Sequence, residues 1–144
     1  MKIFIPIKEN SQRVPNKNFR IFQEKPLYKH TLCKLKKYDV YVDTDSMQIL
    51  NEVSRDPDLK HVTAYPRHKN LIGDEVSVCD LIKFFIKKYN LEGETICQLH
   101  VTSPFLKAGT LAQAATKMKD YDSVVSCNVL QTRLWRREKY GMCP

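Results

Sequence analysis

Short apolar runs alternate with amphipathic stretches along the chain, and this alternation constrains the fold more than any other feature of the sequence. Runs such as KIFIPI are typical of buried strands, whereas apolar residues spaced by three and four are typical of helices. The predicted strands span residues 2–7, 39–43, 61–65, 95–101 and 122–128. One predicted helix begins near Pro26, and three more span residues 46–55, 75–89 and 108–119. We therefore expect an α/β fold with a mostly parallel sheet, right-handed crossovers and helices on both faces.

The helix predicted over residues 75–89 has the clearest pattern. We expect Asp74 to be its N-cap, because a short polar side chain at this position accepts a hydrogen bond from the first turn. The spacing i, i+3, i+4, i+7 and i+11 gives the helix one apolar face, made of Val78, Leu81, Ile82, Phe85 and Tyr89.

Composition excludes several classes of protein. The chain has 144 residues, of which 42% are hydrophobic and 28% charged, so a disordered or fibrous chain is excluded. No apolar run approaches the ~18 residues of a membrane span, and no signal peptide is visible, so we expect a cytoplasmic protein that does not contact membranes. The five cysteines form no C-x-x-C pair, which argues against a disulfide framework or a zinc ribbon. The formal net charge of +8 is spread along the chain and suits any polyanionic partner.

The loops that follow the predicted strands are the places to look for a ligand site. In open parallel sheets, ligands bind outside the carboxyl ends of the strands. The first such loop, residues 8–18, offers cations, amides and a serine, among them Lys8, Ser11, Arg13 and Lys17. It contains neither a P-loop nor a G-x-G-x-x-G motif. From the loop alone, a phosphate site and a solvated turn both remain open.

Two further loops carry candidate ligand groups. The segment Val42-Asp43-Thr44-Asp45 ends a strand with two carboxylates at the ligand-facing edge, and oxygen ligands of this kind suit Mg²⁺ shared with substrate phosphates. A helix cap is the structural alternative for a carboxylate at this edge. His100, Thr102 and Ser103 offer hydrogen-bonding side chains after the fourth strand, and a purely structural role for His100 also remains open.

Five segments of the chain carry a family resemblance. They are IPIKENSQRVPNKN, VYVDTDS, YPRHKNLIGDEVSV, QLHVTSPF and DSVVSCNVL. In the same order, they resemble P-A-R-G-G-S-K-x-[IL]-P-x-K-N, V-x-S-T-D, R-P-x-x-L-x-x-D-x-[AS]-[ST], L-x-Q-P-T-S-P-L and D-S-V-V-S-V. These are motifs of the CMP-N-acetylneuraminate (acylneuraminate) cytidylyltransferases, which activate acidic nine-carbon sugars with CTP. The resemblance implies a Rossmann-like three-layer αβα fold of the nucleotide-diphospho-sugar transferase type.

The resemblance also implies roles for the first loop. Lys8 takes the place of a triphosphate-binding arginine, so the charge is kept while the bidentate fork is lost. Lys17 matches a phosphate-binding lysine, and it is expected to act with Lys8 in catalysis. Asn18 is expected to contact the nucleotide, and Ser11 and Arg13 join the same nucleotide-binding set.

The later segments complete the implied site. Arg67 matches an arginine that contacts the cytidine nucleotide, and Val76 and Val78 are expected to read cytosine through their backbone. His100 replaces a glutamine that contacts substrate, so it is expected to bind the sugar together with Thr102 and Ser103. The expected metal is Mg²⁺, with Asp45 as its ligand.

The resemblance covers only an N-terminal part of the family fold. We expect residues 1–144 to form a single nucleotidyltransferase-like domain that lacks the family's C-terminal part, with its second metal-binding aspartate and its dimerisation elements. A homodimer remains an open expectation. The expected reaction transfers CMP from CTP to a sialic-acid-like sugar and releases pyrophosphate. The alternatives are a nucleotide-binding domain without turnover and a transferase of the 3-deoxy-manno-octulosonate type. A nucleic-acid partner is not expected, since the sequence shows neither an aromatic platform nor a recognition helix.

Overall fold

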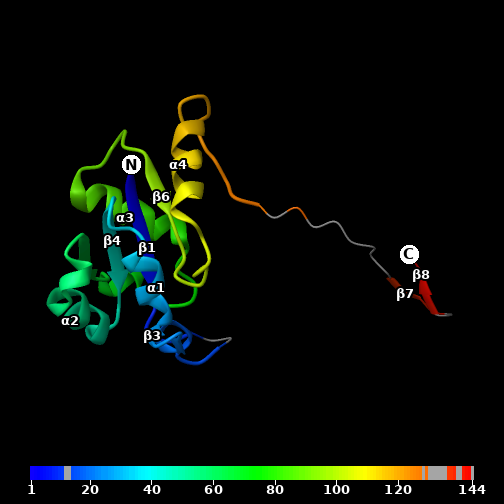
Figure 1. The fold of residues 1–144 in the computed structure, drawn as a ribbon, viewed down its shortest axis with the longest axis horizontal. Helices are drawn as coiled ribbons and strands as arrows, with labels where there is room; N and C mark the ends of the chain where they lie inside the picture. The colour runs from blue at the N-terminus through cyan, green and yellow to red at the C-terminus, as the bar shows by residue number, and fades with distance from the viewer. Residues whose placement is uncertain (12–13, 128, 130–135, 139–140, 144) are drawn as a thin grey trace.

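A four-stranded parallel sheet lies at the centre of the molecule. The structure is a computed structural model that describes residues 1–11, 14–127, 129, 136–138 and 141–143. The strand order is β5-β4-β1-β6, and the strands span Lys2–Ile7 (β1), Asp39–Thr44 (β4), Val62–Pro66 (β5) and Ile96–Gln98 (β6). Parallel pairing sets Ile5 opposite Val42, and Val42 opposite Ala64. Figure 1 shows these strands running through the middle of the domain, with helices outside them.

Three helices cover one face of the sheet and one helix covers the other. The helices span Leu27–Cys33 (α1), Met47–Arg55 (α2), Val78–Tyr89 (α3) and Ala108–Lys117 (α4). Side chains alternate along β1, as strand geometry requires, so Ile3 and Ile5 enter the core built with α1, α2 and α4. Phe4 points to the opposite face, where its ring stacks on Phe85 of α3 with centroids 4.8 Å apart. The expectation of a three-layer αβα fold with a mostly parallel sheet is confirmed.

The smaller elements complete the described chain. Two short antiparallel pairs join Ile21–Phe22 (β2) to Lys25–Pro26 (β3), and Arg136–Glu138 (β7) to Gly141–Cys143 (β8). Single 3-10 turns span Lys17–Phe19 (η1), Pro57–Leu59 (η2) and Lys69–Leu71 (η3). Within the described residues, no helix is both long enough and apolar enough to cross a bilayer.

The start of α3 differs from the prediction. Ser77, not Asp74, is the N-cap: its hydroxyl oxygen accepts a hydrogen bond from the backbone N–H of Asp80 at 3.2 Å. The Ser77 hydroxyl also donates to the Asp80 carboxylate at 2.7 Å, which holds the serine in its capping position. Asp74 lies outside the helix, because its carboxylate pairs with Lys8 at the end of β1.

The predicted strand over residues 122–128 is wrong for the part that is described. Residues 122–127 form no strand, and residue 128 lies outside the described residues. An alternating segment becomes a strand only when a neighbour accepts its backbone hydrogen bonds, and no described residue pairs with the outer edge of β6. Val125 is accordingly 85% exposed, and after α4 the chain leaves the domain (Figure 1).

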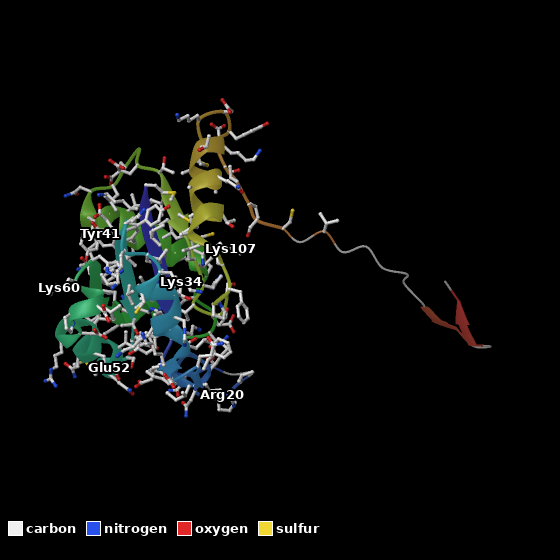
Figure 2. All side chains as sticks on the ribbon, in the orientation of Figure 1. Arg20, Lys34, Tyr41, Glu52, Lys60 and Lys107 are labelled. Carbon is white, nitrogen blue, oxygen red and sulfur yellow. The ribbon has the colours of Figure 1, made fainter. Side chains whose placement is uncertain are left out.

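Charged side chains are distributed around the domain, as the even spread along the sequence predicts. Figure 2 shows labelled charged side chains at separate places around the domain: Arg20, Lys34, Glu52, Lys60 and Lys107. Electrostatic attraction to a ligand therefore depends on the few cations that the fold places next to a pocket.

Candidate functional site

A pocket of about 320 Å³ opens at the carboxyl end of the sheet. It lies where the loops after β1, β5 and β6 meet the start of α3, the position where open parallel sheets bind ligands. Its walls contain most of the site residues predicted from sequence, namely Lys8, Ser11, Lys17, Asn18, Arg67, Val76, Val78, His100 and Thr102. The remaining lining residues are Pro6, Asn10, Asp74, Leu81 and Val101.

Three predicted site residues are not part of this lining. Arg13 lies outside the described residues. Ser103 lines a small separate hollow beneath α4, because its backbone N–H donates to the His100 carbonyl at 3.2 Å and turns the chain away from the pocket. The carboxylate of Asp45 accepts a hydrogen bond from the backbone N–H of Glu9 at 2.7 Å and does not line the pocket.

Lys8 is held at the pocket wall by the loop between β5 and α3. Its ammonium donates to the Gly73 carbonyl at 2.8 Å and to the Asp74 carboxylate at 3.0 Å. Gly73 has a φ of +143°, a backbone conformation that glycine adopts far more easily than other residues. The side chains of Lys8 and Asp74 are 37% and 56% exposed, so water competes for this ion pair.

The first loop is fixed by a buried amide. Asn18 is 5% exposed, and its side-chain N–H donates to the Lys8 carbonyl at 2.8 Å. Asn16 adopts a left-handed backbone with φ of 52°, which asparagine tolerates well, and the 3-10 turn η1 follows directly. This turn places Lys17 at the pocket, where it makes no ion pair with any described residue.

A buried ion pair lies just after β5, where Arg67 lines the pocket. The guanidinium of Arg67 donates through Nε to the Asp43 carboxylate and through Nη2 to the Asp43 carbonyl, the second bond measuring 3.1 Å. The two side chains are 1% and 0% exposed. Burial raises the pKa of the Asp43 carboxyl, and the hydrogen bond and charge of Arg67 oppose that rise. Burial and the nearby Asp43 carboxylate also raise the pKa of the Tyr65 hydroxyl.

Sequence reasoning did not find the roles of Asp43 and Asp74. For Asp43 the available signal was the alternation of side chains along a strand. This alternation places Asp43 on the α3 side of β4, the side on which Tyr65 and Arg67 lie at the end of β5. For Asp74 no local pattern indicated the contact with Lys8, because the two residues lie 66 positions apart in the sequence.

His100, which the sequence predicts to bind the sugar, lines the pocket. Its ring Nε2 lies 3.0 Å from the side-chain nitrogen of Gln98, so the two side chains are in hydrogen-bond contact. Thr102 lines the same side and is exposed. This side therefore offers an imidazole and a hydroxyl for hydrogen bonding, whereas the lysine and arginine side chains belong to the first loop and the end of β5.

The described residues do not form a magnesium site of their own. No group of three or more His, Cys, Asp or Glu residues within the described ranges could hold a metal ion. Asp74 contributes a carboxylate to the pocket lining, but this carboxylate is paired with Lys8. Asp45 accepts a hydrogen bond from the backbone of the first loop and does not line the pocket. The assignment of Mg²⁺ to Asp45 stays a prediction from the family resemblance.

Comparison with known proteins decides the family. The sequence model of the cytidylyltransferases matches residues 3–135. The chain belongs to the cytidylyltransferase family. The resemblance found in the five sequence segments is therefore confirmed.

Relatives of this cytidylyltransferase chain include N-acylneuraminate cytidylyltransferases of Streptococcus agalactiae. Those of serotypes V, III and Ia are each 28% identical over 130 residues, which is 85% of this chain. The chain spans about 30% of the length of these relatives.

Solved structures show the same fold. CMP:2-keto-3-deoxy-manno-octonic acid synthetase complexed with CTP matches with a TM-score of 0.67 and 20% identity, covering 85% of this chain and 48% of that one. A cytidylyltransferase from Leptospira borgpetersenii serovar Hardjo-bovis matches with a TM-score of 0.58 and 19% identity, covering 80% and 47%.

The pocket of this cytidylyltransferase chain combines two kinds of surface. Lys8 and Lys17 present ammonium groups, which suit the dispersed negative charge of phosphates. Val76, Val78 and Leu81 form an apolar wall at the start of α3, which suits a flat ring. A ligand with an anionic group at one end and an aromatic ring at the other fits this pairing of cationic and apolar surfaces.

Proposed function

We propose that the chain forms the CTP-binding part of an enzyme that transfers CMP from CTP to an acidic, sialic-acid-like sugar. The observation that carries this proposal is the convergence of Lys8, Lys17, Arg67 and the Val76–Val78 segment on one pocket at the carboxyl end of the sheet. Membership of the cytidylyltransferase family over residues 3–135 supports the choice of nucleotide.

The proposed reaction is an in-line displacement at the α-phosphorus of CTP. The anomeric hydroxyl oxygen of the sugar forms the new bond to phosphorus and loses its proton to solvent. The bond from phosphorus to the bridging oxygen breaks, and pyrophosphate leaves with that electron pair. Because positioning and charge stabilisation dominate phosphorus transfer of this kind, the protein's task is to hold the phosphates and the nucleophile in line.

Each side of the pocket has a separate task in this proposal. Lys17 and Lys8 bind the phosphates, and charge-assisted hydrogen bonds of this kind are about twice as strong as neutral ones. The backbone from Val76 to Val78 reads the cytosine ring, and the buried pair with Asp43 fixes Arg67 beside the nucleoside. His100 and Thr102 form hydrogen bonds with the sugar.

Calorimetry with the four ribonucleoside triphosphates tests the nucleotide. We expect CTP to bind more tightly than ATP, GTP or UTP, because the apolar wall and the adjacent backbone face a pyrimidine with an exocyclic amine. Equal affinities for all four would reduce the pocket to a generic phosphate site and would contradict the proposal.

Pyrophosphate release with a panel of acidic sugars tests the second substrate. We expect the complete enzyme to release pyrophosphate with N-acetylneuraminate and this 144-residue chain by itself to turn over slowly or not at all. Release only with 3-deoxy-manno-octulosonate would favour the alternative sugar class. The 2-keto-3-deoxy-manno-octonic acid synthetase has the same fold as this chain, which makes that sugar the necessary comparison.

A further inference from the structure

We propose that Asp74 is a specificity-determining residue of this pocket, because its carboxylate occupies the Lys8 ammonium that a polyphosphate chain needs. The inference deepens the proposed function and rests on it for the identity of the nucleotide, but not for the competition itself. In this proposal, Asp74 lowers the affinity for polyphosphates and leaves the affinity for monophosphates unchanged.

The hydrogen bonds of Lys8 show what a ligand must displace. A lysine ammonium has three N–H donors. One is directed to the Gly73 carbonyl at 2.8 Å and one to the Asp74 carboxylate at 3.0 Å. A single donor remains for a ligand, so Lys8 contacts several phosphate oxygens only after it releases the loop that carries Asp74.

Exposure makes the Asp74 bridge displaceable, in contrast to the other ion pair at the pocket. The Lys8 and Asp74 side chains are 37% and 56% exposed, whereas those of Arg67 and Asp43 are 1% and 0% exposed. An exposed pair is worth roughly 0.2–1 kcal/mol, while breaking a buried pair costs several times more. A phosphate can therefore replace Asp74 on Lys8, but it cannot take Arg67 from Asp43 at similar cost.

Lys17 explains why monophosphates escape the competition. Among the residues that the structure describes, no carboxylate forms an ion pair with Lys17. One phosphate group binds there without displacing anything. A second or third phosphate group gains Lys8 only by ending the Lys8–Asp74 contact, so the penalty grows with the length of the phosphate chain.

Binding calorimetry with inorganic tripolyphosphate, CTP and CMP tests the proposal on the full chain. We expect Asp74→Asn to tighten tripolyphosphate and CTP binding by up to about 5-fold, which corresponds to ~1 kcal/mol at 1.4 kcal/mol per tenfold. CMP affinity stays unchanged. Glu75→Gln is the matched control, because it removes the same charge from the neighbouring exposed residue, which does not line the pocket. We expect this control to leave all three affinities unchanged.

A double-mutant cycle tests whether Lys8 mediates the effect. In the Lys8→Met background, we expect Asp74→Asn to give no gain in tripolyphosphate affinity. Asp74→Ser, which removes the carboxylate with a smaller side chain, gives the same gain as Asp74→Asn, and thermal unfolding confirms that both variants fold.

Several results would overturn the proposal. Unchanged or weaker tripolyphosphate binding by Asp74→Asn would mean that Asp74 does not compete, and a gain that persists without Lys8 would assign the effect to the general field. An equal gain from Glu75→Gln would do the same. If tripolyphosphate obeys the cycle while CTP shows no preference over ATP, the competition stands and the proposed nucleotide is wrong.

Discussion

Asp43 shows how one residue links the core to the pocket. Its carboxylate is fully buried at the end of β4, and the guanidinium of Arg67 neutralises it from the end of β5. An isolated charge at such a place is expensive, so each side chain makes the burial of the other possible. The pair also joins the ends of two neighbouring strands, which keeps this wall of the pocket in place.

Removing Asp43 should therefore destabilise the protein strongly. We expect Asp43→Ala to lower the free energy of unfolding by about 3–5 kcal/mol, because it leaves the Arg67 charge buried without its partner. Urea unfolding measures the effect. Asp58→Ala is the control, since the Lys36–Asp58 pair is exposed at 57% and 62% and is worth roughly 0.2–1 kcal/mol. Similar losses for both variants would show that burial of the Asp43–Arg67 pair has no special weight.

Lys17 provides the second test at the scale of one residue. We expect Lys17→Ala to weaken CTP binding by about 10- to 150-fold and to leave cytidine binding unchanged, since a hydrogen bond to a charged group contributes roughly 1.5–3 kcal/mol. Calorimetry with both ligands makes the measurement. Lys25→Ala removes an equal charge from β3, away from the pocket, and should change neither affinity. Equal losses for cytidine and CTP would give Lys17 a structural role.

At the scale of elements, a charged cluster joins α1 to α2 and η2. The Lys29 ammonium lies 3.6 Å from the Glu52 carboxylate and 3.2 Å from that of Asp56. Burial by itself would raise the pKa of Glu52, but the Tyr28 hydrogen bond and the Lys29 charge lower it overall. The backbone N–H of Asp58 and the Lys29 ammonium lower the pKa of Asp56.

These shifts predict a loss of stability in acid. A carboxyl group whose pKa is lower in the folded state stabilises the fold above its unfolded value, here 3.8 for Asp and 4.5 for Glu, and this contribution disappears as the pH falls through the folded pKa. We expect Lys29→Met to reduce the fall in unfolding free energy below pH ~4.5 by about 0.5–1 kcal/mol.

Urea unfolding as a function of pH makes this measurement. Lys60→Met is the control, because Lys60 is exposed and forms no ion pair with the described residues. If Lys29→Met keeps the full acid dependence, other groups control it.

Most elements of the fold could be predicted from local pattern, and the exceptions have physical reasons. The predicted helix at 46–55 corresponds to α2, and the strand at 39–43 to β4. The buried residues Ile49 and Val53 have helical spacing, and Val40 and Val42 have strand spacing. The capping choice at α3 failed because Ser77 and Asp74 are both acceptable caps in sequence, and the distant Lys8 engages Asp74. The segment at 122–127 failed because alternation does not supply a pairing partner.

The candidate site was predicted less completely than the fold. Loop position identified Lys8, Lys17 and His100 as residues near one edge of the sheet, and these residues line the pocket. Ion pairs between distant segments were not predictable in this way. The pairing of Asp43 with Arg67 and the bond of Asp45 to the first loop depend on tertiary geometry that no short window of sequence contains.

At the scale of the whole molecule, the two faces of the sheet are packed unequally. The core shared with α1, α2 and α4 holds most of the buried aliphatic residues, whereas the face covered by α3 is largely aromatic around Phe4 and Phe85. The strands β1 and β4 lie between neighbours on both sides, whereas β5 and β6 each have an outer edge that pairs with no described strand. The inner strands should therefore be locally more stable than the outer ones, because their backbone hydrogen bonds open less often.

Amide hydrogen exchange tests this distribution. We expect the amides of β1 and β4 to exchange most slowly, those of β6 faster, and those of residues 122–127 at nearly the rate of an unstructured peptide. Mass spectrometry of deuterated fragments measures all three groups at once. Protection of residues 122–127 comparable with that of β1 would show that this segment pairs as a strand in solution.

The ion pair between Lys8 and Asp74 has a consequence for inhibitor chemistry. A polyanionic inhibitor has to break that pair, but a zwitterionic fragment does not. A compound that carries an amine and a phosphonate could place its amine beside the Asp74 carboxylate and its phosphonate beside the Lys17 ammonium, with the Lys8–Asp74 pair left intact. Fragment screens that contain only nucleotide mimics would overlook this class, so a screening library for this pocket should include amino-phosphonates.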